Sequence, residues 1–203
     1  MQNLIAPLRE FVREMTVLVG RTSDERELLA TGRSHLAALI AADGWLPDAF
    51  SIPRPDRYGQ YLLYCDPLER FSVVSLVWGP GQQTPIHNHT VWGLVGVLRG
   101  AEHCEEFELM GGVPRATGQV HTMQRGAIEA VSPTVGDWHR VSSASGASTS
   151  VSIHIYGADI GAVSRQKLDD HGKCSDFVSG YDNGVVPNLW GFKMASSGQR
   201  ARQ

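Results

Sequence analysis

Two histidines separated by a single residue, His87 and His89, are the residues of this sequence most suited to chemistry. In a β-strand, side chains two residues apart point to the same side, so the two imidazoles can meet at one point. Two imidazoles so placed suit a divalent transition metal. The pair follows the turn Gly79–Gly81 and precedes the apolar run Val91–Leu98, which places it at the entrance of a β core, where an unpaired ring would be costly. Most histidine pairs with this spacing are surface histidines or have hydrogen-bond partners, so the pair alone is a weak indication of a metal site.

A third ligand is needed, and His139 is our candidate. It lies in a β-like run just after the turn Pro133–Gly136, which can return the chain to the same region. The alternative is a hydrogen-bonded histidine on a strand. Three other histidines are expected at exposed positions and a fourth lies in a polar loop: His35, His103, His121 and, in the loop, His171.

Polar and apolar residues alternate strictly near the end of the β-rich region, so Ser152, His154 and Tyr156 share one face of a predicted strand. The apolar residues between them face the opposite way. Three hydrogen-bonding side chains in a row can form an interior relay that ends in a phenol beside the metal. The alternative is that this face is the solvated side of an antiparallel strand.

The elements that must position these residues are short β-rich runs, which follow one another from Gln60 onward with glycine and proline between them. Strands about ten residues apart, with turn signals between them, predict a sandwich or a small barrel. No intervening stretch is long enough for a crossover helix, which argues against a parallel α/β sheet. The predicted strands are Tyr61–Cys65, Phe71–Trp78, Val91–Leu98, Glu105–Met110, Ala127–Val131, Trp138–Ser142 and Ser150–Tyr156.

The chain before these strands predicts two helices. Apolar residues recur at threes and fours in two stretches, 4–19 and 28–40. Between them, Thr22–Glu25 resembles a capping box that opens the second helix. We therefore expect a single domain over the whole chain, in which a helical segment at 1–50 precedes a β core at 60–165.

The composition excludes several classes of protein. The chain has 203 residues, of which 42% are hydrophobic, and a formal net charge of −3. That apolar fraction is typical of a globular chain, and the near-neutral charge argues against a nucleic-acid partner. No apolar run approaches the roughly 20 residues that span a bilayer, so we expect no membrane contact. Three widely separated cysteines without a C-x-x-C pair fit a cytoplasmic setting better than disulfides or a cysteine zinc site.

The spacing of glycines and histidines in two segments resembles that of the cupin family. The segment Gly81–Gly100 has the pattern G-x5-H-x-H-x3-G-x6-G, which matches the first cupin motif except at Gly93, where the family has a glutamate ligand. The segment Gly136–His139 matches the core of the second motif, with Ser143 where the family commonly has asparagine. A cupin with three histidines and no glutamate resembles the thiol dioxygenases, and among them the bacterial 3-mercaptopropionate dioxygenases, often catalogued as type I cysteine dioxygenases. The resemblance spans Gln60–Arg165, about half of the chain.

The resemblance implies a fold dominated by β-strands, a small barrel or jelly roll of the cupin type with the N-terminal helices packed outside. It implies Fe(II) bound by His87, His89 and His139, and oxidation of 3-mercaptopropionate by O2 to 3-sulfinopropionate. Some cysteine dioxygenases form a Cys–Tyr thioether. The matching position here is Gly93, so we expect no such crosslink.

The resemblance also implies roles for five further residues. In thiol dioxygenases a Ser-x-His-x-Tyr relay occupies the place of Ser152, His154 and Tyr156, and by analogy Tyr156 donates a hydrogen bond to bound oxygen or the substrate thiolate. Arg165, nine residues beyond Tyr156, corresponds to the arginine that binds the substrate carboxylate. Gln60 stands where mammalian-type cysteine dioxygenases place their arginine, and the resemblance implies that it replaces that arginine as a polar contact to the substrate carboxylate, beside Arg165. Without the resemblance, Arg165 reads as an ordinary surface arginine.

Other functions fit the same residues. L-cysteine, oxidised to cysteine sulfinate, is the second candidate substrate for the same chemistry. Three histidines also form a normal zinc set, so a zinc- or manganese-dependent cupin isomerase is a further hypothesis. A non-catalytic cupin that binds a small ligand and acts as a sensor ranks last, because the sequence contains no DNA-binding segment through which a sensor could act. The sequence makes no prediction of the oligomeric state.

Overall fold

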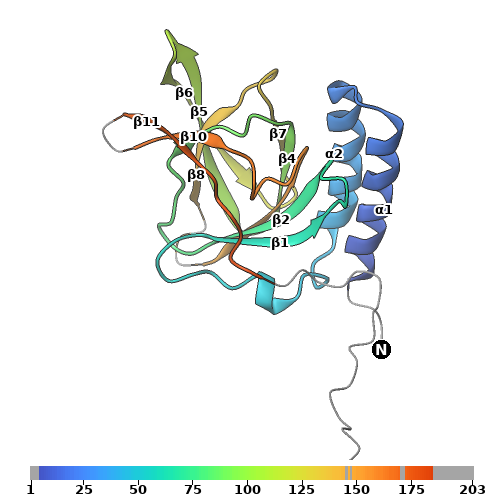
Figure 1. Cartoon of the computed structure of the whole chain (residues 1–203). Helices are drawn as coiled ribbons and strands as arrows, with labels where there is room; N and C mark the ends of the chain where they lie inside the picture. Colours follow the sequence, from blue (N-terminus) through green and yellow to red (C-terminus); the bar gives the residue numbers. More distant parts are fainter. Residues whose placement is uncertain (1–4, 145, 147, 170–171, 185–203) are drawn as a thin grey trace, which may run out of the picture.

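Two antiparallel β-sheets face each other in the computed structural model, which describes residues 5–144, 146, 148–169 and 172–184. Two helices lie beside one of the sheets (Figure 1). The predicted fold class, a β-dominated barrel with N-terminal helices, is therefore confirmed. No helix within the described ranges is long and apolar enough to cross a membrane. His171 of the predicted polar loop lies outside the described residues.

The first sheet has five strands in the order β1-β2-β9-β4-β7, and all neighbouring pairs are antiparallel. The strand β9 lies at its centre, between β2 and β4, so the predicted relay residues are held by neighbours on both sides. The strands are β1 (Gly59–Cys65), β2 (Ser72–Trp78), β4 (Gly93–Arg99), β7 (Ile128–Val131) and β9 (Ser150–Tyr156).

The second sheet has six strands in the order β11-β10-β3-β8-β5-β6. The short strand β3 lies between β10 and β8, and this pairing places His87 directly opposite His139. The strands are β3 (Ile86–His87), β5 (Ala101–Met110), β6 (Val113–Gln124), β8 (Trp138–Ser143), β10 (Arg165–Leu168) and β11 (Cys174–Phe177).

A long hairpin of β5 and β6 differs from the sequence prediction. Only the segment Glu105–Met110 was predicted as a strand, whereas His103 and His121 both lie in strands and not beside turns. The turn residues Gly111 and Gly112 have φ angles of 62° and 82°, which suits a tight two-residue hairpin. Most side chains of β6 are exposed, so the strand lacks the apolar alternation by which buried strands are identified. The tip of the hairpin extends beyond the barrel (Figure 1).

Two antiparallel helices, α1 (Ala6–Arg21) and α2 (Glu25–Ala41), form the N-terminal segment, followed by a 3-10 turn, η1 (Asp48–Phe50). The predicted cap of the second helix is present, because the side chain of Asp24 accepts a hydrogen bond of 3.0 Å from the backbone N–H of Arg26. This bond satisfies one of the free N–H groups of the first helical turn.

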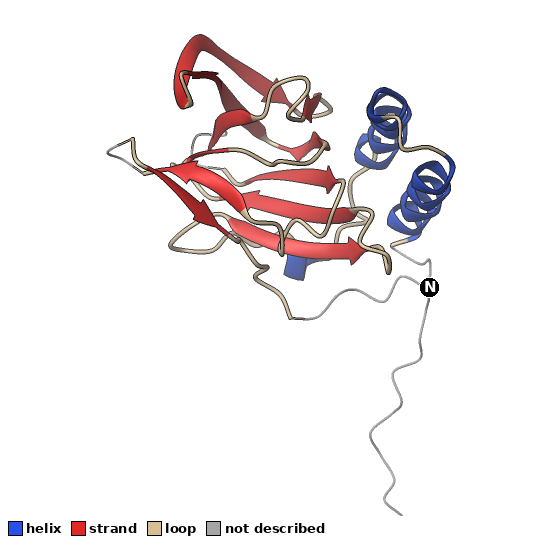
Figure 2. Cartoon of the chain, turned by 45° about the horizontal axis from the view of Figure 1, so that its top comes forward, coloured by secondary structure: helices blue, strands red, loops and turns tan. Residues whose placement is uncertain are grey.

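The helices cover the outer face of the five-stranded sheet (Figure 2). Contact is close at Gly96 of β4, where an added Cβ would lie 3.0 Å from side-chain carbons of both Leu36 and Ile40 of α2. The absence of a side chain at Gly96 therefore lets α2 approach the sheet.

The strand β9 is buried on both faces. Its apolar residues Val151, Ile153 and Ile155 belong to the buried cluster that includes the helices. The residues between them point the opposite way, into the barrel, and the relay residue with the largest side chain, Tyr156, packs there with Val74 of β2. The face that carries the relay is therefore part of the interior, and the alternative of a solvated face is wrong.

The packing of α2 against the sheet predicts the effect of a cavity. Leu36 is fully buried, so we expect Leu36→Ala to lower the free energy of unfolding by about 2–5 kcal/mol, through lost burial and the cavity left behind. Urea denaturation followed by circular dichroism measures this change. The control is Val17→Ala in α1, where the side chain is 65% exposed and the expected change is within about 0.5 kcal/mol. An equal effect of the two variants would contradict the packing described.

Candidate metal centre

Three imidazoles meet inside the barrel. His87 and His139 are paired across β3 and β8, and His89 follows β3 after one residue. The ring centroids lie 4.9 Å apart for His87 and His89, and 4.8 Å apart for each of these rings and His139. All three residues are buried, with 8%, 1% and 7% of their surface exposed. The structure therefore brings the three predicted ligands together.

Each ring uses its Nδ1 atom for contact with the protein. His87 Nδ1 lies 3.1 Å from the carbonyl oxygen of Pro85, and His89 Nδ1 lies 3.0 Å from a carboxylate oxygen of Asp137. His139 Nδ1 lies 3.6 Å from the sulfur of Cys104. This leaves the Nε2 atoms as ligands for a metal, and Nε2 of His89 is buried with no hydrogen-bond partner. A buried polar atom without a partner is costly unless a ligand occupies it, so the residues fit a metal ion.

The three imidazoles are neutral at neutral pH. Burial lowers the pKa of His87 to about 4, and it lowers the pKa values of His89 and His139 well below the ordinary value. The neighbouring imidazoles lower the pKa values of His89 and His139 further. Neutral imidazole is the form that binds a metal. A divalent ion bound here would keep its full charge, because none of the three ligands carries a compensating charge.

Gly93 stands at the position of the glutamate in the cupin motif, and side chains crowd that position. A Cβ added to Gly93 would lie 2.8 Å from a ring carbon of Tyr156, 2.9 Å from a methyl carbon of Val131 and 3.1 Å from the backbone carbonyl oxygen of Ile155. A glutamate or a cysteine at this position would therefore require the side chains of Tyr156 and Val131 to shift. Among the described residues, the group of ligating atoms around this centre contains the three histidines and no carboxylate.

Asp137 is a residue of the centre that the sequence analysis did not single out. Its carboxylate accepts hydrogen bonds from the backbone N–H groups of His89 and Thr90, at 2.8 and 3.0 Å, in addition to its contact with the His89 ring. These bonds fix both the ring and the backbone of His89, and a carboxylate behind a ligating histidine also raises its basicity. The sequence signal that could have identified Asp137 is its position two residues before His139.

The predicted relay is a continuous chain of hydrogen bonds on β9. Ser152 Oγ lies 2.8 Å from His154 Nε2, and His154 Nδ1 lies 2.8 Å from the hydroxyl of Tyr156. Burial lowers the pKa of His154 to about 3, so the ring is neutral and carries one proton that either nitrogen can hold. The direction of each bond in the chain depends on that tautomer.

Tyr156 connects the relay to the metal ligands. Its ring stacks on the ring of His89, with centroids 5.4 Å apart and planes 18° from parallel. Burial raises the pKa of the Tyr156 hydroxyl, which the nearby charge of Arg165 partly opposes. Tyr156 therefore keeps its proton at neutral pH and can donate a hydrogen bond to a molecule bound beside the imidazoles.

Arg165 is a buried cation, not a surface arginine. Its Nη2 donates a hydrogen bond of 2.6 Å to Ser179, and its guanidinium carbon lies 4.6 Å from the centre of the Phe177 ring. Its Nε is buried without a partner. Within the described part of the chain, Arg165 forms no ion pair with a carboxylate, and its charge lowers the pKa values of His87 and His89. Burial lowers its own pKa. Such a cation is stabilised by an anion from outside.

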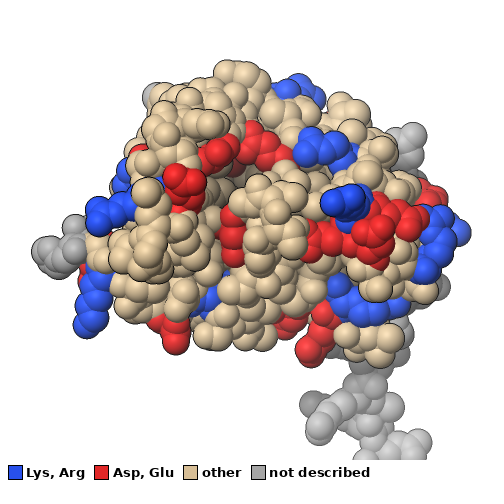
Figure 3. Space-filling model, turned by 90° about the horizontal axis from the view of Figure 1, so that it is seen from above, with Lys and Arg blue, Asp and Glu red and all other residues tan. Residues whose placement is uncertain are grey.

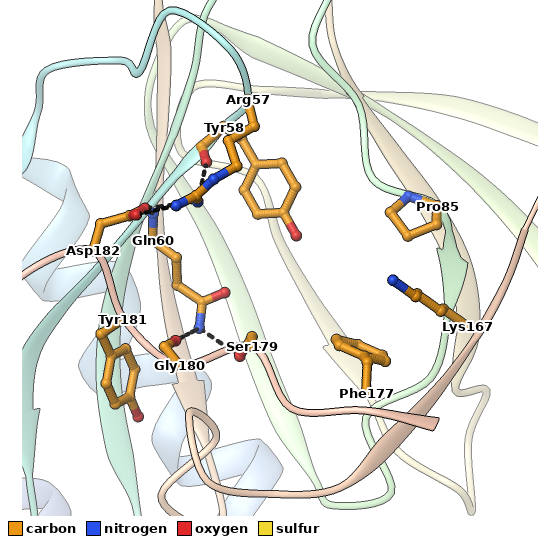
Figure 4. Close-up of a pocket in the computed structure, with 10 residues that line it drawn as sticks. All are labelled: Arg57, Tyr58, Gln60, Pro85, Lys167, Phe177, Ser179, Gly180, Tyr181 and Asp182. Atoms are coloured by element: carbon orange, nitrogen blue, oxygen red, sulfur yellow. Dashed lines mark hydrogen bonds and ion pairs between the residues drawn. The ribbon is translucent and has the colours of Figure 1, made fainter. Parts of the chain in front are cut away.

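Gln60 lines a cavity of about 250 Å³ together with Ser179 and Phe177, both of which contact Arg165 (Figure 4). Its side-chain nitrogen donates to Ser179 Oγ and to the carbonyl oxygen of Gly180, both at 3.0 Å. Because both N–H groups are used in this way, Gln60 holds the segment that carries Ser179, the partner of Arg165. Figure 4 shows the amide oxygen turned toward the cavity. The predicted contact of Gln60 with a substrate carboxylate stays a prediction.

A second group of potential ligand atoms comes from Cys104, His121 and Glu129, next to His139. His121 and Glu129 already form a hydrogen bond with each other, so they have partners without a metal. Burial raises the pKa of the Cys104 thiol to about 12, so Cys104 is a neutral thiol at neutral pH.

On the face shown in Figure 3, acidic side chains surround a hollow, and basic side chains are scattered toward the edge.

Several solved structures are similar to part of this chain. A protein with a double-stranded β-helix domain from Klebsiella pneumoniae subsp. pneumoniae MGH 78578 is 18% identical, with 55% of this chain and 85% of that chain covered and a TM-score of 0.44. A cupin 2 conserved barrel domain protein from Rhodopseudomonas palustris is 13% identical, with 61% and 77% covered and a TM-score of 0.43. An oxalate oxidase in complex with glycolate is 14% identical, with 52% and 53% covered and a TM-score of 0.42.

This chain thus spans about half the length of that oxalate oxidase. The sequence matches no family model. Proteins with so little identity can catalyse different reactions on the same fold, so the function must be argued from the site itself.

The contacts of Asp137 predict a large effect on metal binding. We expect the wild-type chain to bind one Co²⁺ ion, and Asp137→Ala to bind it about 10–100-fold more weakly, because His89 loses the group that orients its ring. Asp137→Asn keeps an oxygen acceptor and should lie between the two. Equilibrium dialysis under anaerobic conditions measures the affinities. The exposed Asp48 provides the control variant Asp48→Ala, and wild-type affinity in Asp137→Ala would refute the role of this carboxylate.

Proposed function

We propose that this protein is a non-haem Fe(II) thiol dioxygenase that oxidises 3-mercaptopropionate to 3-sulfinopropionate. The observation that carries the proposal is a buried set of three neutral imidazoles that no carboxylate completes among the described residues. Oxygenases that use 2-oxoglutarate typically have two histidines and one carboxylate. A centre with only neutral ligands leaves the negative charge to be supplied by the substrate.

A thiol is the substrate group that fits this requirement. The three histidines would hold a ferrous ion, and such an ion would lower the pKa of a thiol that coordinates it, which favours the thiolate form of the substrate. In the overall reaction the O–O bond breaks and both oxygen atoms bond to the sulfur. The sulfur supplies all the electrons that O2 accepts, so the reaction consumes no other reductant.

Arg165 supports a substrate with a carboxylate. It is buried, it forms no ion pair with a described carboxylate, and one of its N–H groups has no partner. A guanidinium binds a carboxylate through two parallel hydrogen bonds, which also orients the substrate. Phe177 is a neighbour of both Arg165 and His87: its ring centre lies 4.6 Å from the guanidinium carbon of Arg165 and 6.5 Å from the ring centre of His87. The cation and the imidazoles therefore border the same aromatic ring.

The charge of the site favours 3-mercaptopropionate over L-cysteine. Cysteine carries an ammonium group, which would lie close to both the metal and Arg165 and would meet like charges there. Asp137, the carboxylate behind His89, is already occupied by its three hydrogen bonds. L-cysteine therefore remains the second candidate substrate, with lower expected efficiency.

The relay has the role of holding a proton beside the substrate. His154 fixes the hydroxyl of Tyr156, and the stacking of Tyr156 on His89 fixes its ring. A phenol held in this way is preorganised, so it donates a hydrogen bond to the reacting groups without reorganisation during the reaction. Ser152 holds the far side of the His154 ring.

Oxygen consumption tests the proposed reaction. We expect the Fe(II)-loaded protein to consume one O2 per 3-mercaptopropionate and to form the sulfinate, with a kcat/KM higher than that for L-cysteine. An oxygen electrode and mass spectrometry of the product measure both. A higher kcat/KM for cysteine would reverse the order of the two substrates. If the Fe(II) form oxidises neither thiol, the proposal is wrong. Isomerase activity of the Zn²⁺- or Mn²⁺-loaded protein would then favour the isomerase hypothesis.

The carboxylate site makes a separate prediction. We expect Arg165→Gln to lower kcat/KM for 3-mercaptopropionate by about 100-fold, since two charge-assisted hydrogen bonds are lost. The kcat/KM for 1-propanethiol, which has no carboxylate, should stay within a factor of about three of wild type. Arg115→Gln on the exposed hairpin is the control. An equal loss for both thiols would show that Arg165 acts on the fold or the metal and not on the carboxylate.

A further inference from the structure

A glutamate at the inner end of the relay has no place in the mechanism so far. Glu102 of β5 has none of its surface exposed, and neither of its carboxyl oxygens has a partner with hydrogen-bond geometry. The hydroxyl of Ser152 and the indole of Trp78, which are hydrogen-bonded to each other, are the polar side chains that act on its carboxyl. The carboxyl is therefore a neighbour of the Ser152 end of the chain that runs through His154 to Tyr156.

The surroundings of Glu102 favour its neutral form. Burial raises its pKa to about 8, and the nearby polar groups of Ser152 and Trp78 oppose this rise. Within the described residues, no lysine, arginine or histidine stabilises its charge. The titratable groups that respond to its charge are Cys104 on the same strand and Tyr156 on β9, and that charge raises the pKa of both. A buried carboxyl without a cation is kept where it has a task or a bound water.

The hydrogen-bond capacity of Ser152 links this carboxyl to His154. A hydroxyl has one proton to donate and two lone pairs to accept. One lone pair accepts from the indole N–H of Trp78, at 3.3 Å. The other lone pair and the proton are left for His154 Nε2, which lies 2.8 Å away, and for a hydrogen bond with the neighbouring Glu102 carboxyl. A bond donated by Ser152 to one of these groups leaves the lone pair for the other.

The protonation state of Glu102 decides between two complete arrangements. Neutral Glu102 donates to Ser152, Ser152 donates to His154 Nε2, and His154 then carries its proton on Nδ1 and donates to the oxygen of Tyr156. The phenolic proton is then free to point at the substrate. Ionised Glu102 accepts from Ser152, so Ser152 accepts from a protonated Nε2, and Nδ1 accepts the phenolic proton of Tyr156. In both arrangements every group of the chain is satisfied.

We infer that Glu102 is a positioning residue whose proton sets the tautomer of His154 and thereby the direction of the Tyr156 O–H bond. The inference rests on the proposed function only for its effect on the reaction; the tautomer of His154 is a property of the folded chain. With Glu102 neutral, Tyr156 donates toward the metal ligands. With Glu102 ionised, Tyr156 presents only its lone pairs there.

Nitrogen NMR of the histidine rings tests the inference without any turnover. Chemical shifts of Nδ1 and Nε2 distinguish the two neutral tautomers, and comparison with a His154→Gln variant assigns the signal in the Zn²⁺-loaded, full-length protein. We expect the proton of His154 to move from Nδ1 to Nε2 as the pH rises through about 8, the pKa of Glu102. In Glu102→Gln, which cannot ionise, we expect one tautomer at all pH values.

Glu108→Gln is the matched control, because Glu108 lies on the same strand at an exposed position. It should titrate like wild type. A His154 tautomer that is constant between pH 6 and 10 in wild type overturns the inference, and so does a change that persists in Glu102→Gln. The wild-type titration tests the inference even if Glu102→Gln folds poorly.

The pH dependence of the reaction gives a second readout. We expect kcat for 3-mercaptopropionate to fall at alkaline pH with an apparent pKa near 8 in wild type and in Glu108→Gln. This alkaline limb should be absent in Glu102→Gln. A purely structural role of Glu102 would lower kcat or stability at every pH and leave the limb in place. If the protein oxidises no thiol, the proposed function fails, whereas the NMR titration still decides the inference.

Discussion

The structure depends on the burial of three imidazoles that must remain uncharged. A buried ring is stable only if its nitrogen atoms have partners. The protein supplies these partners on the Nδ1 side, through a carbonyl group, a carboxylate and a thiol. The Nε2 side is left for a cation. The strands around the site follow from this constraint, because β3 and β8 must be adjacent and in one register for His87 and His139 to meet.

The two sheets divide the chemistry between them. The six-stranded sheet carries His87, His139 and Arg165, and His89 follows its strand β3, whereas the five-stranded sheet carries the relay on β9. The two sets of residues meet inside the barrel, where the ring of Tyr156 stacks on that of His89. The helices serve this arrangement from outside, because they cover the apolar face of β9 and so keep its polar face turned inward. The relay is therefore positioned by contacts remote from the metal.

Much of the site could be predicted from the sequence, because a strand repeats every two residues and that rule is local. It placed His87 with His89, and Ser152 with His154 and Tyr156, on shared faces. The contacts that the sequence did not reveal join distant segments. Gln60 is bound by Ser179 and Gly180, more than a hundred positions away. Glu102 reads as an ordinary polar residue of a strand until the closure of the barrel brings it against Ser152.

The close approach at Gly93 limits how such a site can be changed. A carbon added at this position would lie 2.8 Å from a ring carbon of Tyr156, so a side chain there displaces the Tyr156 ring. That ring stacks on the imidazole of His89. An acidic ligand at position 93 and the present position of the phenol therefore compete for the same space.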